Sequence, residues 1–190
     1  MRIGLLGGSF NPAHEGHRHI IELARRHLGL DQVWLLVSPG NPLKPPRGMA
    51  PLPDRLASAR GIADGRHVLA STIEAIWGTR YTIDTLRLLL LRFPRARFVW
   101  LMGADILLQL PRWRRWLEFV HRIRIAVLPR PGYNYRALAS QAARRFAAAR
   151  RPMRSAGRLN KLAAPAWVFL NVPQHAASAT ALRDSIGAEP

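Results

Sequence analysis

Apolar and polar positions along the chain follow two alternating patterns. Short, continuous apolar runs predict strands over 2–7, 33–37, 67–71, 97–103, 123–132 and 165–172. Longer segments with apolar residues at helical spacing predict helices over 16–28, 54–63, 81–93, 104–110, 113–120, 136–150 and 178–186. This alternation is typical of a doubly wound parallel sheet with helices on both faces. We therefore expect an α/β fold, built as a single domain over residues 1–190.

Two segments add to this picture. In the first expected helix, Ile21, Ala24 and Leu28 recur at helical spacing while charged residues fall elsewhere, so one face packs on the sheet. The segment 38–53 is rich in proline and has little apolar periodicity. It is therefore expected to be a connector that runs over the surface.

The composition fits a cytoplasmic protein. The chain has 190 residues, of which 48% are hydrophobic, enough for one sizeable core. It has no cysteine, which excludes disulfides, thiolate catalysis and cysteine-based zinc sites and suits a reducing compartment. No signal-peptide pattern is present, and the apolar run 88–91 is far shorter than the roughly 20 residues of a membrane span. We expect no membrane segment.

The formal net charge is +18, from 29 basic and 11 acidic residues. Such a surplus attracts polyanions, either nucleic acid or a phosphorylated small molecule. Lys44 and Lys161 are the only lysines, so the excess of arginine can also reflect the codon usage of a GC-rich genome.

The stretch GGSFNPAHEGH, residues 7–17, joins the first expected strand to the first expected helix. In an open parallel sheet, this loop lies at the carboxyl edge, where ligands bind. Glycine lets a ligand approach the main chain closely, and the free N–H groups of a helix start attract anions. The loop has neither the G-x-G-x-x-G spacing of a dinucleotide fingerprint nor the G-K-[ST] ending of a P-loop.

His14 and His17 lie three residues apart at the start of this helix, so both imidazoles project from one face. Two imidazoles in that position can hydrogen-bond the same polyphosphate. Taken alone, the histidines could also be surface or helix-capping residues, or zinc ligands. HEGH departs from the H-E-x-x-H pattern and no third ligand follows at metal spacing, which argues against zinc.

GGSFNPAHEGH resembles the signature of the adenylyltransferase branch of the nucleotidyltransferases, whose H-x-G-H motif is shared with class I aminoacyl-tRNA synthetases. The resemblance implies a Rossmann-like sheet, glycines that make room for the nucleotide, and histidines that hold ATP phosphates through the transition state. The residues that it implies at the ATP site are Gly8, Ser9, Phe10, His14, Gly16 and His17.

Four further segments, GTRYTIDTL, LMGADILLQLPRWRRW, LPRPGY and SATALR, resemble in order and spacing the bacterial nicotinate-nucleotide adenylyltransferases of NAD synthesis. The resemblance implies adenylyl transfer from ATP to nicotinate mononucleotide, which gives nicotinate adenine dinucleotide and pyrophosphate. The implied partners are these two small-molecule substrates. Mg²⁺ is the implied cofactor; it enters with ATP and is held mainly by phosphate oxygens and water.

The same resemblance assigns roles to further residues. Four residues are implied to be catalytic through their contacts with phosphates: His14, His17, Lys44 and Arg183. The other implied ATP contacts are Gly103, Asp105, Ser178 and Thr180. Asp105 is implied to accept hydrogen bonds from ribose hydroxyls, although the residue taken alone could be only a helix cap.

The acceptor pocket is implied by the middle motifs. Thr82 and neighbouring main-chain N–H groups are implied to receive the nicotinate ring and its carboxylate. Trp113 is implied to stack on that ring, a contact worth about 1 kcal/mol beyond burial. Arg130 is implied to pair with the acceptor phosphate. Taken alone, Trp113 could be core packing and Arg130 a solvated loop charge.

Two positions depart from the family pattern. Ala179 stands where the last motif usually has a serine, so one hydroxyl near the adenosine or phosphate is missing. Arg80 stands where the family often has a serine beside the Tyr-Thr pair, which adds positive charge near the acceptor site.

Two other functions compete with this interpretation. A sister adenylyltransferase acting on phosphopantetheine is opposed by the YTIDTL and PRWRRW segments. A nucleic-acid-binding module would use the basic segment 144–161, but its arginines are not interleaved with aromatics as in single-strand binders. The sequence leaves open the preference for the acid over the amide acceptor, and whether the protein is a homodimer.

Overall fold

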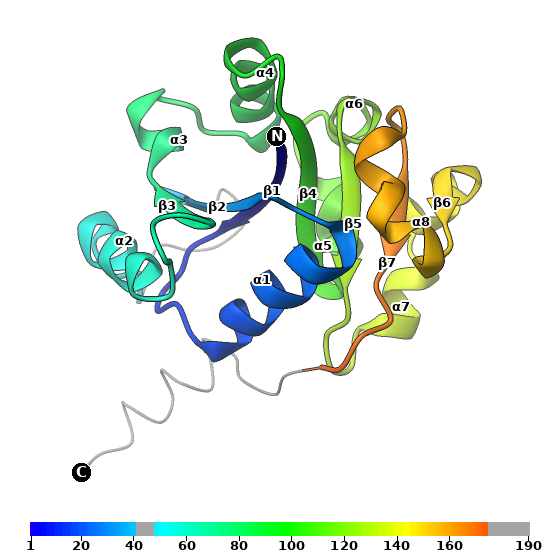
Figure 1. Cartoon of the computed structure of the whole chain (residues 1–190), viewed down its shortest axis with the longest axis horizontal. Coiled ribbons are helices and arrows are strands. Elements are labelled where there is room, and N and C mark those ends of the chain that lie inside the picture. The colour runs from blue at the N-terminus through cyan, green and yellow to red at the C-terminus, as the bar shows by residue number, and fades with distance from the viewer. Residues whose placement is uncertain (41–47, 175–190) are drawn as a thin grey trace.

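The computed structural model describes residues 1–40 and 48–174 (Figure 1). Seven strands form one sheet in the order β3-β2-β1-β4-β5-β7-β6, and every neighbouring pair is parallel. The strands are β1 (Arg2–Gly8), β2 (Gln32–Val37), β3 (Val68–Ser71), β4 (Arg97–Gly103), β5 (Arg124–Leu128), β6 (Arg150–Arg151) and β7 (Trp167–Phe169). The sheet confirms the expected α/β fold.

Helices cover both faces of this sheet (Figure 1). They are α1 (Glu15–Leu28), α2 (Leu52–Gly61), α3 (Ile73–Ile76), α4 (Thr82–Arg92), α5 (Ala104–Gln109), α6 (Trp116–Arg122), α7 (Asn134–Leu138) and α8 (Gln141–Arg145). Three 3-10 helices add η1 (Leu110–Arg112), η2 (Ala147–Ala149) and η3 (Met153–Lys161). In β4, Trp100 packs in the core formed with α4, α5 and α6, whereas Val99 and Leu101 pack in the core formed with α1 and η3. This alternation confirms the doubly wound arrangement.

The strand order places the ligand edge of the sheet. From β1 the chain proceeds outward through β2 and β3, and then returns to pair β4 with the other side of β1. The switch point of the sheet therefore lies between the carboxyl ends of β1, at Gly8, and β4, at Gly103. Ligands of open parallel sheets bind at such a point.

The segment between β5 and β7 differs from its prediction. The single helix expected over 136–150 is wrong, because α7 and α8 are separate short helices followed by η2 and the edge strand β6. Ala139 ends α7, and the Ser140 hydroxyl accepts the N–H of Ala143 at 3.2 Å to begin α8. A serine that bonds the main chain of the following turn favours a helix start over a helix interior.

Other elements agree with their predictions in part. Within the stretch 123–132, β5 ends at Leu128, where Pro129 and Pro131 have no N–H for a ladder, as expected for a strand that its prolines terminate. α4 buries Ile83, Leu86 and Leu89 and leaves Leu91 75% exposed, so one face of this strongly apolar helix is open to solvent. The short helices α3 and η3 have no counterpart among the expected elements. The helix expected over 178–186 lies outside the described residues.

In residues 1–40 and 48–174, no helix combines the length and the apolar character that crossing a membrane requires.

Candidate active site

The turn after β1 contains a buried phenylalanine with an unusual backbone conformation. Phe10 is 1% exposed and has a left-handed backbone, with φ of 49°. Its ring lies 5.0 Å from the His17 imidazole. Non-glycine residues rarely adopt this conformation, and they cluster at functional sites when they do. The predicted ATP residues Gly8 and Ser9 lie directly before this bend.

His14 and His17 cap α1 reciprocally. The N–H of Gly16 donates to His14 Nδ1 at 3.1 Å, and the N–H of His14 donates to His17 Nδ1 at 3.3 Å. The two rings lie 4.0 Å apart between centroids. The capping interpretation of the histidines is therefore correct, and it brings both imidazoles to the carboxyl edge of the sheet side by side.

This capping also fixes the proton position in each ring. Since a main-chain N–H can only donate, Nδ1 of each histidine must be an acceptor, and the neutral ring then carries its proton at Nε2. Burial lowers the pKa of His17 to about 3, and the nearby His14 ring and Arg130 guanidinium act in the same direction. At neutral pH, His17 is therefore an uncharged donor.

Asp105 and Arg130 lie at the neighbouring strand ends. Asp105 belongs to the first turn of α5, just after Gly103, and its Oδ1 is 3.9 Å from Arg130 Nε. Among the described residues, this buried oxygen has no hydrogen-bond partner. The residue does not cap α5, because Gly103 holds that position without a side-chain bond. An orphaned carboxylate oxygen is suited to accepting a hydrogen bond from a ligand hydroxyl.

A hollow opens between α1 and the end of β5. Its lining includes Gly16, Ile20, Leu128, Arg130 and Pro173. The hollow combines apolar walls with one guanidinium and the start of a helix, which suits a ligand that has an apolar ring and an anionic group.

Two of the three predicted acceptor residues, Thr82 and Trp113, lie on elements that pack on the face of the sheet opposite α1. Thr82 is the first residue of α4, and no side chain caps that helix start. Trp113 follows η1 and packs edge-on against Trp100 and Phe119, with centroids 6.2 and 5.4 Å away. Trp113 is half-buried, so part of the ring is core packing and part remains accessible.

A buried arginine of α2 supports the turn from behind. Arg55 is 2% exposed, and its guanidinium donates to the carbonyls of Ser9, Ser38, Pro39 and Ala50 at 2.9, 2.6, 3.2 and 2.9 Å. It therefore ties the turn after β1 to the end of β2 and to the approach to α2. Nothing in the sequence indicates this role, since an arginine within DRLASAR has the pattern of a surface charge.

The predicted residues therefore fall into three groups. The structure brings together Gly8, Ser9, Phe10, His14, Gly16, His17, Gly103, Asp105 and Arg130 at the carboxyl ends of β1, β4 and β5. Thr82 and Trp113 lie on elements that flank this edge. The others, Lys44, Ser178, Thr180 and Arg183, lie outside the described residues.

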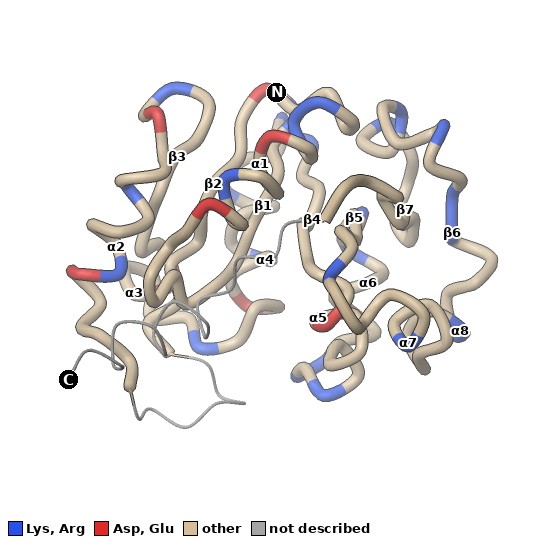
Figure 2. The backbone as a smooth tube through the Cα atoms, turned by 90° about the horizontal axis from the view of Figure 1, so that it is seen from below, with Lys and Arg blue, Asp and Glu red and all other residues tan. Residues whose placement is uncertain are grey.

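Charge is distributed unevenly around the site. The sequence has no aspartate or glutamate between Glu118 and Asp184. Figure 2 accordingly shows Lys and Arg, without Asp or Glu, on the part of the tube formed by α7, α8 and β6. The half of the sheet that begins at β5 is thus strongly basic.

Comparisons with known proteins agree with this geometry. The cytidylyltransferase-like family matches residues 5–185. A relative from Gluconobacter oxydans is 57% identical over 185 residues, which cover 97% of this chain and 95% of that protein. A relative from Gluconacetobacter diazotrophicus is 58% identical over 184 residues, which cover 97% of this chain and 86% of that protein. Both are named "probable nicotinate-nucleotide adenylyltransferase".

The fold is similar to solved structures with little sequence identity. Plasmodium falciparum nicotinic acid mononucleotide adenylyltransferase complexed with NaAD has a TM-score of 0.71 at 14% identity, covering 96% of this chain and 82% of that chain. The same protein complexed with APC has a TM-score of 0.69 at 14% identity, with the same coverage.

Proposed function

The chain belongs to the nicotinate-nucleotide adenylyltransferases of the cytidylyltransferase-like family, and we propose that its site transfers the adenylyl group of ATP to nicotinate mononucleotide. The protein is a nucleotidyltransferase of NAD biosynthesis. Its substrates are small molecules, and its products are nicotinate adenine dinucleotide and pyrophosphate.

The reaction needs no nucleophile from the protein. A phosphate oxygen of the acceptor attacks the α-phosphorus of ATP and forms the new P–O bond. The bond from that phosphorus to the oxygen bridging to the β-phosphate breaks, and pyrophosphate leaves with the electron pair. The protein therefore contributes alignment and stabilisation of the charge on the phosphate oxygens.

The observation that carries the proposal is the pair of imidazoles with their protons at Nε2. His14 and His17 lie side by side, and Nδ1 of each ring accepts from a main-chain N–H, so each ring carries a single N–H, at Nε2, of fixed direction at the carboxyl edge of the sheet. A fixed neutral donor needs no reorganisation when charge develops on that oxygen. The orphaned Oδ1 of Asp105 supports its assignment to the ribose hydroxyls.

The other site roles rest on position. Arg130, close to both Asp105 and His17, is assigned to the acceptor phosphate. The uncapped first N–H groups of α4 and Thr82 are assigned to the nicotinate carboxylate, and Trp113 to its ring. Lys44, Arg183, Ser178 and Thr180 keep their sequence-based assignments as predictions. Gly8, Ser9, Phe10, Gly16 and Gly103 likewise keep their predicted contacts with ATP as predictions.

Mg²⁺ is proposed to enter with ATP. Imidazoles whose Nε2 is protonated donate and do not ligate a metal, so His14 and His17 fit a site in which phosphate oxygens and water hold the ion. When bound, the ion would neutralise charge on the phosphates. A cytoplasmic location stays a prediction of the sequence, as does the absence of nucleic acid among the partners.

Pyrophosphate release tests the proposal. Purified protein is given Mg-ATP with nicotinate mononucleotide, nicotinamide mononucleotide or phosphopantetheine in separate reactions. We expect turnover with nicotinate mononucleotide, and turnover with phosphopantetheine alone would overturn the acceptor. His17→Ala should lower turnover by about a hundredfold, the usual cost of one charge-stabilising donor. The control is His67→Ala, a partly exposed residue just before β3, and it should retain the wild-type rate.

A further inference from the structure

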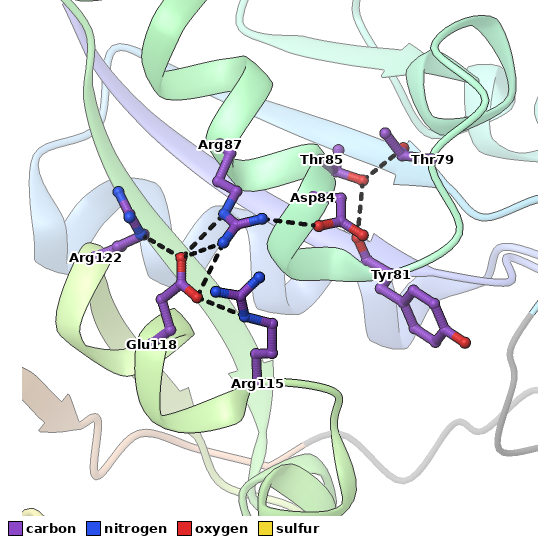
Figure 3. Close-up of polar contacts among 8 residues, drawn as sticks. All are labelled: Thr79, Tyr81, Asp84, Thr85, Arg87, Arg115, Glu118 and Arg122. Carbon is purple, nitrogen blue, oxygen red and sulfur yellow. Dashed lines mark hydrogen bonds and ion pairs between the residues drawn. The ribbon is translucent and has the colours of Figure 1, made fainter.

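One carboxylate joins the two elements that flank the proposed acceptor pocket. Glu118 of α6 accepts two hydrogen bonds from Arg87 of α4, from Nε to Oε1 at 2.9 Å and from Nη2 to Oε2 at 3.1 Å (Figure 3). Arg115 Nε lies 2.8 Å from Oε2, and Arg122 Nε lies 2.7 Å from Oε1. Three guanidiniums thus surround one carboxylate. The bidentate bond from Arg87 is the one that crosses between elements.

We propose that the Arg87–Glu118 pair is a positioning device: it holds the loop that carries Trp113 at a fixed distance from the first turn of α4, and so sets the affinity for the acceptor nucleotide. This inference rests on the proposed function, because Thr82 and Trp113 are assigned to the acceptor there. Neither Arg87 nor Glu118 is proposed to touch substrate.

The loop between η1 and α6 needs such support. Arg115 precedes α6 with φ of 53°, a left-handed conformation that costs a non-glycine residue roughly 1–2 kcal/mol. Its guanidinium is held by Glu118, and its main-chain oxygen accepts from Phe119 N at 3.1 Å. The bend directs the neighbouring Arg114 over the ring of Tyr81, 4.7 Å from its centroid. Tyr81 directly precedes the first residue of α4, so the loop meets α4 at two points.

The charge state of Glu118 suits this role. Partial desolvation raises its pKa, but the hydrogen bonds from Arg122 and Arg87 and the charge of Arg115 outweigh that effect and leave the pKa below its usual value. The carboxylate is therefore ionised at neutral pH, and the bidentate bond is maintained over the range in which the enzyme would work.

Two of the three arginines, Arg87 and Arg122, provide a matched pair of variants. Arg87 bonds Glu118 across two elements, whereas Arg122 bonds the same carboxylate from within α6, four residues away. Arg87→Met and Arg122→Met each remove one positive charge and one partner of Glu118, and methionine keeps most of the apolar stem. The other ion pair of Arg87, with Asp84 at 3.3 Å, lies within α4 and joins no second element.

Steady-state kinetics of the full chain tests the proposal. For Arg87→Met we expect the KM for nicotinate mononucleotide to rise about fivefold, the scale of network mutations, with the KM for ATP and kcat within about twofold of wild type. Arg122→Met should leave all three constants within about twofold. Arg87→Lys, which keeps the charge but loses the bidentate bond, should fall between wild type and Arg87→Met. If Arg87→Met does not fold, the lysine variant alone decides.

Three results would overturn the inference: an unchanged KM for the acceptor in Arg87→Met, an equal rise in Arg122→Met, or an equal rise in the KM for ATP. Absence of wild-type turnover with nicotinate mononucleotide would instead refute the proposed function itself. The wild-type reaction therefore separates the two failures.

Discussion

Replacing Arg55 by lysine would measure how far one buried guanidinium supports the phosphate-binding turn. Its four bonds reach the carbonyls of Ser9, Ser38, Pro39 and Ala50. A lysine ammonium has three donors at a single point and can keep about half of these bonds. Each carbonyl left buried without a partner costs about 1–3 kcal/mol, so the change should cost about 3 kcal/mol in the free energy of unfolding.

In a chain of this length, that loss lowers Tm by roughly 6–12 °C, which calorimetry can measure directly. The KM for ATP should rise as well, because Ser9 lies in the turn that precedes His14 and His17. Arg60→Lys is the control, since Arg60 is exposed on the same helix and should shift Tm by less than about 1 °C. A fall of less than about 2 °C in Arg55→Lys would refute the reasoning.

Three further predictions concern single site residues. Because the fold lowers the pKa of His17 to about 3, the unfolded chain binds a proton below about pH 6.5 that the folded chain does not. The contribution of this pKa shift to the free energy of unfolding is complete above that pH and is lost as pH falls. Between pH 7 and 5, the free energy of unfolding of the wild type, measured by chemical denaturation, should therefore fall by about 2 kcal/mol more than that of His17→Gln. Equal decreases would contradict the low pKa. Trp113→Ala should raise the KM for nicotinate mononucleotide about tenfold with little change in the KM for ATP, and an unchanged acceptor KM would exclude stacking. In Gly103→Ala, the added Cβ would overlap Asp105 Oδ1, so the KM for ATP should rise severalfold while the acceptor KM stays constant; an unaffected KM for ATP would separate Asp105 from ATP binding.

Much of the fold could be predicted because central parallel strands are continuously apolar. β1, β2 and β4 were expected within one or two residues, since both faces of each strand are buried and leave an unambiguous run. The single helix expected over 136–150 was wrong for the opposite reason. Its alanines and arginines suit a helix at almost every position, and only tertiary contacts and the Ser140 cap divide it into short pieces.

Of the site, the residues that belong to a sequence motif could be predicted, and those that support them from elsewhere in the chain could not. His14 and His17 stand in a spaced motif with glycines, so the sequence alone indicated a phosphate site. Arg55 and Glu118 stand in no motif, and their importance comes from partners on other segments, such as Ser9, 46 residues from Arg55, and Arg87, 31 residues from Glu118. Such contacts exist only after the elements have packed, and periodicity carries no sign of them.

The lack of carboxylates between Glu118 and Asp184 bears on how substrates arrive as well as on how they are held. Both substrates are anions, and fixed positive charge on one flank of the site raises their local concentration before any contact is made. That advantage fades as the Debye length shortens from about 10 Å at 0.1 M salt to about 3 Å at 1 M. The encounter rate, and with it kcat/KM, is therefore the quantity that ionic strength should govern, while kcat stays nearly constant.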